Sequence, residues 1–217
     1  TDSVIFTPEG SSTATFSTND SLGFGGGSTV NVTVTDNTAG SFNVKATRLS
    51  GGTADATVIG TSGLVTVSSG AASTLTEVSS NSPIKAGTTR RLQVRVDDAF
   101  GNPVSGASVT FAINTGSGSF SGSNPATSDA NGIAFVDYTS SETSGGNDVI
   151  DVTSAPATAI QITLPVDPGS VSYYTFTPAT DSSIIAGINI QFTLTAKDQF
   201  GNDVINNGSV TLKGQGS

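Results

Sequence analysis

The sequence contains no cysteine, histidine, methionine or tryptophan. Without cysteine and histidine there is no disulfide, thiolate nucleophile, Ser-His-Asp triad or imidazole metal ligand, which excludes most hydrolase designs. The glutamates Glu9, Glu77 and Glu142 lie in different modules or at loop-like positions, which disfavours the paired carboxylates of a glycosidase. We therefore predict that the chain is not an enzyme and has no catalytic residue, no metal site and no cofactor.

Charged residues are also scarce, at 12% of the chain, and they sum to a net charge of −9. A chain of this charge is repelled by a nucleic-acid backbone and by an anionic membrane surface, so we expect neither as a partner. The sequence has no run of 18 or more apolar residues and no signal-peptide pattern at its start. We expect no membrane insertion of this segment.

Glycine, by contrast, is abundant, with 26 residues, and threonine, serine and valine are frequent. This composition is typical of short strands joined by tight turns, whereas long helices would need more leucine, alanine, glutamate and lysine. The sequence therefore predicts an all-β fold in which helices are almost absent.

An internal repeat organises the chain. The segment Asp98–Val104 (DAFGNPV) returns 100 positions later as Asp198–Val204 (DQFGNDV). Upstream, Ile84–Gly87 (IKAG) matches Ile184–Gly187 (IIAG), and downstream Ser108–Phe111 matches Ser209–Leu212 after a one-residue slip. A fixed period of this length indicates stacked copies of one module.

The repeat divides the chain into three segments, and only the middle one is a complete module. The first segment, residues 1–68, opens with Ser3–Phe6, which resembles Ser108–Phe111, and its Phe16 corresponds to Phe120, so it is the C-terminal part of a module. The third segment, residues 168–217, repeats the N-terminal part of a module. Linkers at 68–70 and 167–169 are expected to act as hinges.

The middle segment, residues 69–167, carries seven stretches with the period-two alternation of strands. Seven short strands in about 100 residues predict an immunoglobulin-like sandwich of two antiparallel sheets. The predicted strands are 73–78, 89–97, 107–113, 118–121, 132–139, 148–153 and 159–164. The predicted inward residues are Leu75, Leu92, Val94, Val96, Val109, Phe111, Phe135 and Ile162.

The stretch from Asp98 to Phe111, followed by Ser128–Ala134 (SDANGIA), resembles the bacterial immunoglobulin-like group 1 domain. This is the stalk module of invasin- and intimin-type surface proteins. The resemblance covers the middle and third segments well and the first 68 residues only loosely. It implies tandem immunoglobulin-like sandwiches in an extracellular, rod-like bacterial array that carries or spaces an adhesive tip.

The residues of the repeated motif also have a direct interpretation. The Phe-Gly-Asn-Pro sequence predicts a hairpin turn, in which Asp98 and Asp198 accept backbone N–H bonds and Phe100 and Phe200 cover one end of a sandwich. The alternative is a calcium site formed by Asp97, Asp98 and Asn102, three clustered oxygen ligands. That alternative is disfavoured because the repeat has Lys197 in place of Asp97.

Other charged groups are interpreted as structural. Asp129-Ala130-Asn131-Gly132 resembles the start of an EF-hand loop, but Ser140 stands where the loop requires glutamate, so a turn is expected. Asp148 and Asp151 are interpreted as solvated edge charges. Arg90, Arg91 and Arg95 are interpreted as surface charge that discourages edge pairing, with contact to an acidic neighbouring module as the alternative.

These observations predict a non-enzymatic structural or adhesion segment, a rod-like spacer of tandem domains at the bacterial cell surface or in a surface appendage. Its expected partners are neighbouring modules or copies of itself, head to tail, and a host or surface receptor reached through a distal domain. One alternative is a self-assembling filament subunit, in which the third segment of one chain packs with the first segment of the next. A second alternative is a carbohydrate- or receptor-binding module.

Overall fold

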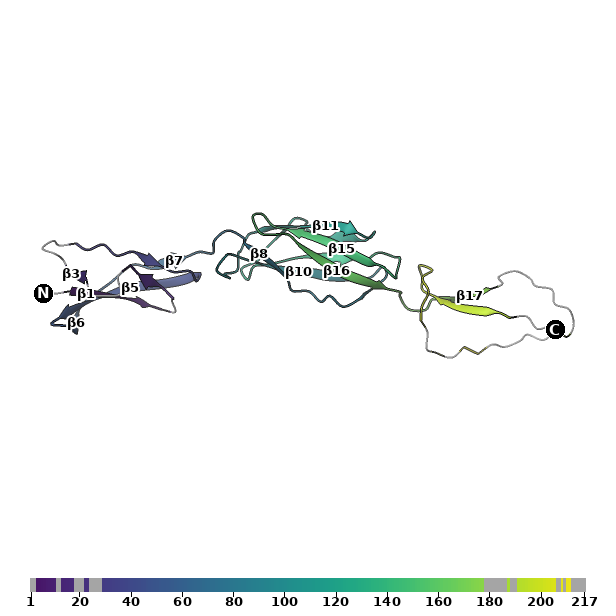
Figure 1. Ribbon diagram of the computed structural model, residues 1–217, viewed down its shortest axis with the longest axis horizontal. Helices are drawn as coiled ribbons and strands as arrows, with labels where there is room; N and C mark the ends of the chain where they lie inside the picture. Colours follow the sequence, from purple (N-terminus) through teal and green to yellow (C-terminus); the bar gives the residue numbers. More distant parts are fainter. Residues whose placement is uncertain are drawn as a thin grey trace.

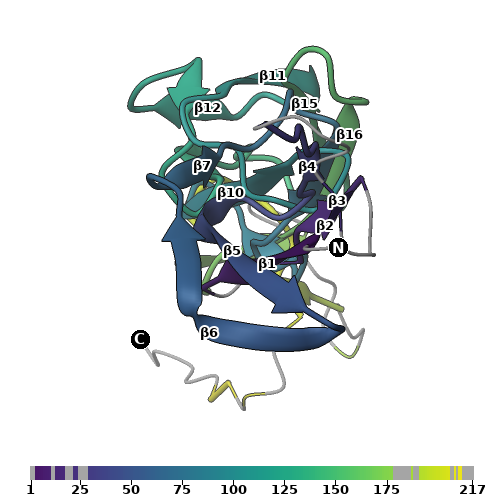
Figure 2. The same ribbon diagram turned by 90° about the vertical axis from the view of Figure 1, so that its left-hand side faces the viewer.

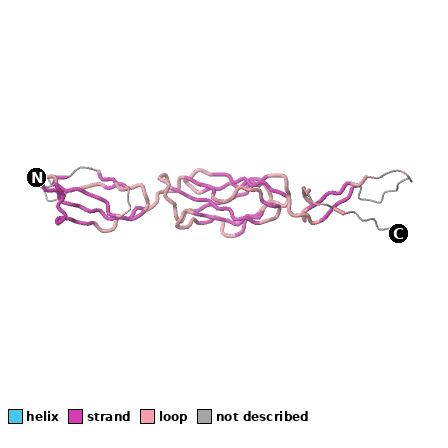
Figure 3. The backbone as a smooth tube through the Cα atoms, turned by 90° about the horizontal axis from the view of Figure 1, so that it is seen from below, coloured by secondary structure: helices cyan, strands magenta, loops and turns pink. Residues whose placement is uncertain are grey.

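Three groups of strands follow one another along the long axis of the molecule, with the first and third segments at opposite ends of the middle one (Figure 1). The computed structural model describes residues 3–10, 13–17, 22–23, 29–177, 187, 191–205, 208 and 210–211. Within these residues all regular structure is strand, as Figure 3 shows. This part of the chain therefore has no helix that could cross a bilayer, and the all-β prediction is confirmed.

The middle segment is a sandwich of two sheets. Four strands form one sheet in the order β12-β14-β10-β8, and five form the other in the order β13-β11-β15-β16-β9. All pairs are antiparallel except β16 with β9. Their bounds are β8 (Thr74–Glu77), β9 (Ile84–Lys85), β10 (Thr89–Asp97), β11 (Ser108–Thr115), β12 (Ser119–Ser121), β13 (Ala126–Thr127), β14 (Ile133–Thr139), β15 (Asn147–Thr153) and β16 (Ile160–Asp167).

The core of this sandwich comes from the alternate residues of each strand, which face the opposing sheet. Seven of the eight predicted inward residues are buried, namely Leu75, Leu92, Val94, Val96, Val109, Phe111 and Ile162. The prediction for Phe135 is wrong, because β14 turns Ala134, Val136 and Tyr138 inward and leaves Phe135 45% exposed. Phe135 instead lies under the Arg91 guanidinium, 4.0 Å from the ring centroid.

The two short strands β9 and β13 are the elements that the sequence pattern did not predict. Each contains only two residues, too few to show an alternation. The seven longer strands all occur where they were expected, with ends that differ by up to three residues.

The described residues of the first segment form two sheets. Its larger sheet has the order β3-β1-β5-β6, with β7 also paired to β5, and its smaller sheet is the pair β2-β4. Figure 2 looks along the molecule with this segment in front. The bounds are β1 (Ser3–Glu9), β2 (Thr15–Phe16), β3 (Leu22–Gly23), β4 (Val34–Thr35), β5 (Gly40–Ser50), β6 (Thr53–Thr61) and β7 (Val65–Val67).

The strand pairing of the first segment resembles that of the middle segment. Ser3 pairs with Gly23 in β1-β3 as Ser108 pairs with Thr127 in β11-β13. Phe6 lies 6.2 Å from Phe16, between ring centroids, and the corresponding rings in the middle segment, Phe111 and Phe120, lie 6.3 Å apart. The strand pair β2-β4 therefore corresponds to β12-β14.

The described strands of the third segment are β17 (Tyr173–Thr177) and β18 (Thr193–Lys197), which form an antiparallel pair. Tyr174 pairs with Ala196 here as Leu75 pairs with Val96 in β8-β10. The repeat seen in the sequence is thus a repeat of strand register. Most of the predicted match at 209–212 and at 184–187 lies outside the described residues.

We predict that two glycines of the middle segment differ in their tolerance of alanine, although their backbone conformations are alike. Gly106 and Gly132 have φ of 78° and 76°. A Cβ at Gly106 would meet nothing within 4 Å, whereas one at Gly132 would lie 2.6 Å from the Val96 carbonyl oxygen. Gly106→Ala should cost ~1–2 kcal/mol for the left-handed conformation, and Gly132→Ala a further ~1–3 kcal/mol for overpacking.

The measurement is urea unfolding followed by circular dichroism, with tyrosine fluorescence, to which the buried Tyr138 contributes, as a second probe. Gly106→Ala is the matched control, since it imposes the same backbone strain without the contact. Equal losses in the two variants would show that the close approach at Gly132 has no energetic consequence.

Candidate functional site

The aspartate of the repeated motif lies at the junction between two segments. We call the junction of the first and middle segments the first joint, and that of the middle and third segments the second joint. The Asp98 Oδ1 accepts hydrogen bonds from the backbone N–H of Phe100 (2.8 Å) and Asn102 (2.9 Å). Its Oδ2 accepts from the Gly70 N–H (2.8 Å) and from Asn102 Nδ2 (2.9 Å). One carboxylate therefore holds both its own turn and the linker that enters the middle segment.

Asp198 makes the same four bonds in the second joint. The N–H groups of Phe200 and Asn202 donate to its Oδ1, each at 2.9 Å. The Gly169 N–H and Asn202 Nδ2 donate to its Oδ2, each at 2.8 Å. The predicted turns and their backbone N–H bonds are confirmed, and the linker glycines expected at hinges are hydrogen-bonded to the module that follows.

The motif asparagine connects adjacent segments. Asn102 Nδ2 donates to the Asn37 carbonyl oxygen (2.8 Å), and its Oδ1 accepts from the Ala39 N–H (2.9 Å). With the bond to Asp98, the Asn102 amide thus uses both of its N–H groups and its oxygen. Asn102 is only 9% exposed, so these bonds are largely shielded from water.

Asn202 repeats this contact across the second joint. Its Nδ2 donates to the Glu142 carbonyl oxygen (2.7 Å), and its Oδ1 accepts from the Ser144 N–H (3.0 Å). In both joints the side-chain amide binds the carbonyl of one loop residue and the N–H two positions later. Two bonds in opposite directions fix the orientation of the amide against the loop, and hence of one segment against the next.

The two motif phenylalanines differ, although the sequence predicts the same role for both. Phe200 packs against the core of the middle segment across the second joint. It lies so close to Gly87 that a Cβ there would be 2.4 Å from the ring. Phe100 is 65% exposed, so the prediction that it covers a sandwich end is wrong. The described strands of the first segment include no counterpart of β9.

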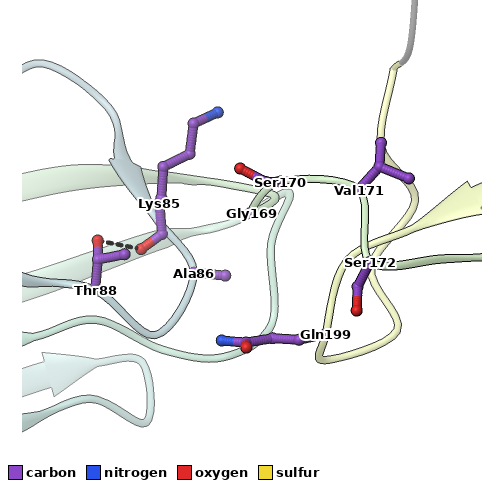
Figure 4. A pocket seen from close by; sticks show the side chains of 8 residues that line it. All are labelled: Lys85, Ala86, Thr88, Gly169, Ser170, Val171, Ser172 and Gln199. Atoms are coloured by element: carbon purple, nitrogen blue, oxygen red, sulfur yellow. Dashed lines mark hydrogen bonds between the residues drawn. The ribbon is translucent and has the colours of Figure 1, made fainter.

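A cleft of about 400 Å³ lies beside the second joint, lined by Lys85, Ala86, Thr88, Gly169, Ser170, Val171, Ser172 and Gln199. Figure 4 shows Gln199 extending from the third segment towards the middle segment. Lys85, the charged residue of the lining, pairs with Asp167 at 3.6 Å. The lining combines hydroxyl and amide groups from the middle and third segments.

Hydrogen bonding controls the ionisation of the joint carboxylates. For Asp98, the bonds from the Asn102 side chain, the Gly70 N–H and the turn N–H groups outweigh burial and hold its pKa well below 3.8. For Asp198, burial alone would raise the pKa, but the bonds from Asn202, Gly169 and Phe200 lower it to about 2. Both carboxylates are therefore ionised at neutral pH.

The calcium alternative does not fit this geometry. Asp98 and Asn102 lie together, but the Asp98 oxygens already face four N–H donors, whose positive ends would repel a cation. Asp97 does not join them, since it pairs with Arg95 at 2.8 Å. The described residues contain no group of three or more acidic side chains able to hold a metal ion. The prediction that the chain has no metal site remains a prediction.

The remaining candidates are distributed over the middle segment. Asp129 forms the expected turn, accepting from the N–H groups of Asn131 (2.8 Å) and Ile133 (2.9 Å). Asp148 is not a solvated edge charge as predicted; it is 1% exposed and accepts from the Ser141 N–H at 2.8 Å. Burial raises the pKa of the neighbouring Tyr138 hydroxyl, and the negative charge of Asp148 adds to this effect.

The arginines do not protect a sheet edge, because β10 lies between β14 and β8. Arg91 pairs with Asp137 (2.9 Å), and Arg95 pairs with Asp97. Arg90 donates to the carbonyl oxygens of Ser80, Ser82 and Pro83, which fixes the loop before β9. Each arginine thus has a partner within the middle segment.

Sequence reasoning missed the contact of the motif asparagine with the preceding segment. The signal was present, since Asn102 and Asn202 recur at the same position between Asp98 or Asp198 and the following strand. A turn alone would tolerate other residues at that position. The retention of asparagine in both copies was therefore the available indication of a second role.

The family model of the bacterial Ig-like domain (group 1) matches residues 72–165. Among solved structures, FdeC, described as a broadly conserved Escherichia coli adhesin, is 20% identical, with 90% of this chain and 62% of that chain covered and a TM-score of 0.53. That likeness shows a shared fold. No curated protein matches the chain.

Two further solved structures are similar at lower TM-scores. InvD of Yersinia pseudotuberculosis is 17% identical, with 94% of this chain and 62% of that chain covered and a TM-score of 0.47. Domains 4–9 of the surface layer protein SbsC are 21% identical, with 86% of this chain and 28% of that chain covered and a TM-score of 0.39. The chain thus spans less than two thirds of each of these three structures.

We predict that the second joint weakens in acid only at unusually low pH. Because the pKa of Asp198 in the folded chain lies at about 2, below the ordinary 3.8, its stabilising bonds are fully present above pH ~4 and are lost as the pH falls through about 2. The measurement is an NMR titration of the amide protons of Gly169 and Phe200, which donate to this carboxylate. Both should shift with a midpoint near 2.

Asp198→Asn is the control for this titration, because asparagine does not ionise in the same range. The acid-dependent shifts of Gly169 and Phe200 should disappear in this variant. A midpoint near 3.8 in the parent chain would show that the four hydrogen bonds do not stabilise the ionised form.

Proposed function

Because residues 72–165 form a bacterial Ig-like domain of group 1, we propose that the chain is a non-enzymatic spacer, a rigid part of a rod-like array in a bacterial surface protein. The observation that carries this proposal is the joint itself. The same aspartate, asparagine and linker glycine occur at both junctions, with the same hydrogen bonds. The hydrogen bonds are the same at both joints, although the loop residues that they contact differ. Such joints are suited to holding modules in line.

The mechanism of such a spacer is mechanical. A flexible linker of a few residues would let modules swing, whereas hydrogen bonds from the motif asparagine to the preceding loop and from the linker glycine to the aspartate restrict bending. At the second joint, Phe200 adds apolar contact with the core of the middle segment. A stiff array holds the domain at its far end at a distance from the surface to which the array is attached.

The fold shared with the adhesin FdeC supports an extracellular setting, at the cell surface or on a surface appendage. The absence of cysteine and histidine from the sequence supports a role without catalysis. In this proposal the receptor contact belongs to a distal domain, and this segment provides reach and direction.

We predict that Asn202→Ala makes the second joint flexible without unfolding either segment. The chain has no cysteine, so Thr163→Cys and Thr193→Cys would carry two spin labels, one on each side of the joint. Electron–electron distance measurements should give a narrow distribution in the parent and a clearly broader one in Asn202→Ala, because both bonds to the Glu142–Ser144 loop are lost.

Asn131→Ala is the matched control, since Asn131 lies in an exposed turn before β14, at the end of the middle segment opposite the second joint. Its distance distribution should equal that of the parent. A broad distribution already in the parent would mean that the joint does not stiffen the chain, and the spacer proposal would lose its mechanical basis.

A second candidate function, carbohydrate binding, is favoured by one surface feature. A groove of about 430 Å³ beside β14 is lined by Ser121, Gly122, Ser123, Ala126, Thr127, Phe135, Val136 and Asp137. It combines an exposed aromatic ring with hydroxyls and a carboxylate, groups that can stack against a sugar ring and bind its hydroxyls. Arg91 orders the ring and the carboxylate by contacting both.

We predict that, if this groove binds sugar, Phe135→Ala abolishes saturable binding on a glycan array, because the stacking surface is removed. Ile205→Ala, at a residue 92% exposed in the third segment, should leave binding unchanged. A parent chain that binds no glycan would exclude this second function and leave the spacer proposal intact.

A further inference from the structure

Asp148 occupies a position of the sandwich core. The residues at 148, 150 and 152 of β15 face inward, and Ile150 and Val152 are fully buried, while Asp148 is only 1% exposed. An ionisable side chain in such a position costs free energy unless hydrogen-bond donors surround it. The hydrogen bonds that Asp148 accepts therefore indicate what the residue does.

Both carboxylate oxygens of Asp148 bind the same residue, Ser141. The Ser141 N–H donates to Oδ2 at 2.8 Å, and the Ser141 hydroxyl donates to Oδ1 at 2.5 Å. The hydroxyl oxygen in turn accepts from the Ser117 N–H at 2.7 Å. Ser141 is buried and lies near the start of the loop 140–146, which joins β14 to β15. We call this loop, and the loop 36–39 of the first segment, the receiving loops, because each binds a motif asparagine.

Ser141 supports both surfaces that the third segment contacts. Its carbonyl oxygen accepts from the Gly87 N–H at 3.2 Å, and Gly87 is the residue over which the Phe200 ring lies. The next residue is Glu142, whose carbonyl oxygen accepts from Asn202 Nδ2. The aromatic contact and the amide contact of the second joint therefore depend on one buried serine, and through it on Asp148.

The receiving loop of the first joint has a comparable support, built from different residues. Asp36 directly precedes Asn37, whose carbonyl oxygen accepts from the motif asparagine. The Asp36 Oδ1 accepts from the Thr38 N–H at 2.9 Å and from the Thr13 hydroxyl at 2.8 Å. A carboxylate thus holds the receiving loop at both joints, from within the loop in the first segment and from the neighbouring strand in the middle one.

We propose that Asp148 is a positioning residue of the second joint. From within the core it holds Ser141, and it thereby presents the Gly87 turn and the receiving loop as one preformed surface. This surface fits a segment that carries a phenylalanine and an asparagine two positions apart in a turn, as Phe200 and Asn202 are. The inference rests on the spacer proposal and adds to it the group that orders the receiving side of the joint.

Preformation matters because ordering a loop on contact costs conformational entropy. With Ser141 held by Asp148, this cost is met when the middle segment folds, and the joint itself needs to order less. The two contacts of the third segment are then coupled. Loss of the bonds at Ser141 weakens the contacts of Phe200 and Asn202 together, through a substitution at neither residue.

The test is Asp148→Asn in the full chain, which keeps the volume of the side chain but replaces one acceptor by an N–H donor facing Ser141. Amide hydrogen exchange should be followed by NMR at the Gly87 N–H and at the Ser144 N–H, which donates to Asn202. Both should exchange about tenfold to a hundredfold faster, the range expected for loss of a hydrogen bond to a charged group.

The spin-label distances across the second joint give a second readout. They should broaden in Asp148→Asn, and adding Asn202→Ala to the same chain should broaden them little further, because both changes remove the same contact. Ser141→Ala removes the hydroxyl but keeps the N–H, so it should broaden the distances in the same direction and to a smaller extent. It is the second variant should Asp148→Asn not fold.

Asp151→Asn is the matched control. Asp151 lies three positions later, on the outer face of β15, and accepts from Asn114 Nδ2 (2.9 Å) and Gln161 Nε2 (2.8 Å). The same substitution there removes bonds across the sheet and none behind the receiving loop. Exchange at Ser144 and the label distances should therefore equal those of the parent.

A parent with narrow distances that Asp148→Asn leaves unchanged, with unchanged exchange at Ser144, would overturn this inference and leave the spacer proposal intact. Faster exchange spread evenly over the whole middle segment would also overturn it, since the carboxylate would then serve the stability of the sandwich and not the joint. Broad distances already in the parent would refute the spacer proposal, and this role of Asp148 with it.

Discussion

One carboxylate at each joint fixes both a turn and a linker, and the arrangement of the segments depends on it. Asp98 and Asp198 each receive hydrogen bonds from the turn, from the linker glycine and from the motif asparagine. Their ionised form is stabilised by these donors, which is why an acidic side chain stays charged although it is almost fully buried. Without the carboxylate, the asparagine side chain and the linker glycine would lose the hydrogen-bond acceptor that they share.

The sequence predicted the sandwich well because its strands are long enough to display their period. Leu92, Val94 and Val96 alternate along β10, and all three are buried as expected. The prediction for Phe135 was wrong because apolar character alone does not decide which alternate residues of a strand face the core. In β14 the inner face is formed by Ala134, Val136 and Tyr138. Phe135 lies on the outer face, where it contacts Arg91. The prediction for Asp148 was wrong because its hydrogen-bond partner, Ser141, lies outside β15. The residue pattern of that strand therefore does not show the bonds.

The joint was predictable only in part. The Asx-type turn follows from local chemistry, because aspartate accepts N–H groups two and four positions later in its own motif. The bonds of Asn102 to residues 37 and 39 join positions more than 60 residues apart, and no local pattern specifies them. The same holds for Phe200, whose contact at Gly87 joins positions more than 100 residues apart.

The asparagine at each joint contacts only the main chain of the loop that it binds. The loop residues differ completely, Asn37 and Ala39 at one joint and Glu142 and Ser144 at the other, yet the two contacts are the same. Recognition of peptide groups leaves the loop side chains unconstrained. Loop sequences can therefore diverge between duplicated copies, and an array of this kind can gain or lose a repeat while every new neighbour still fits.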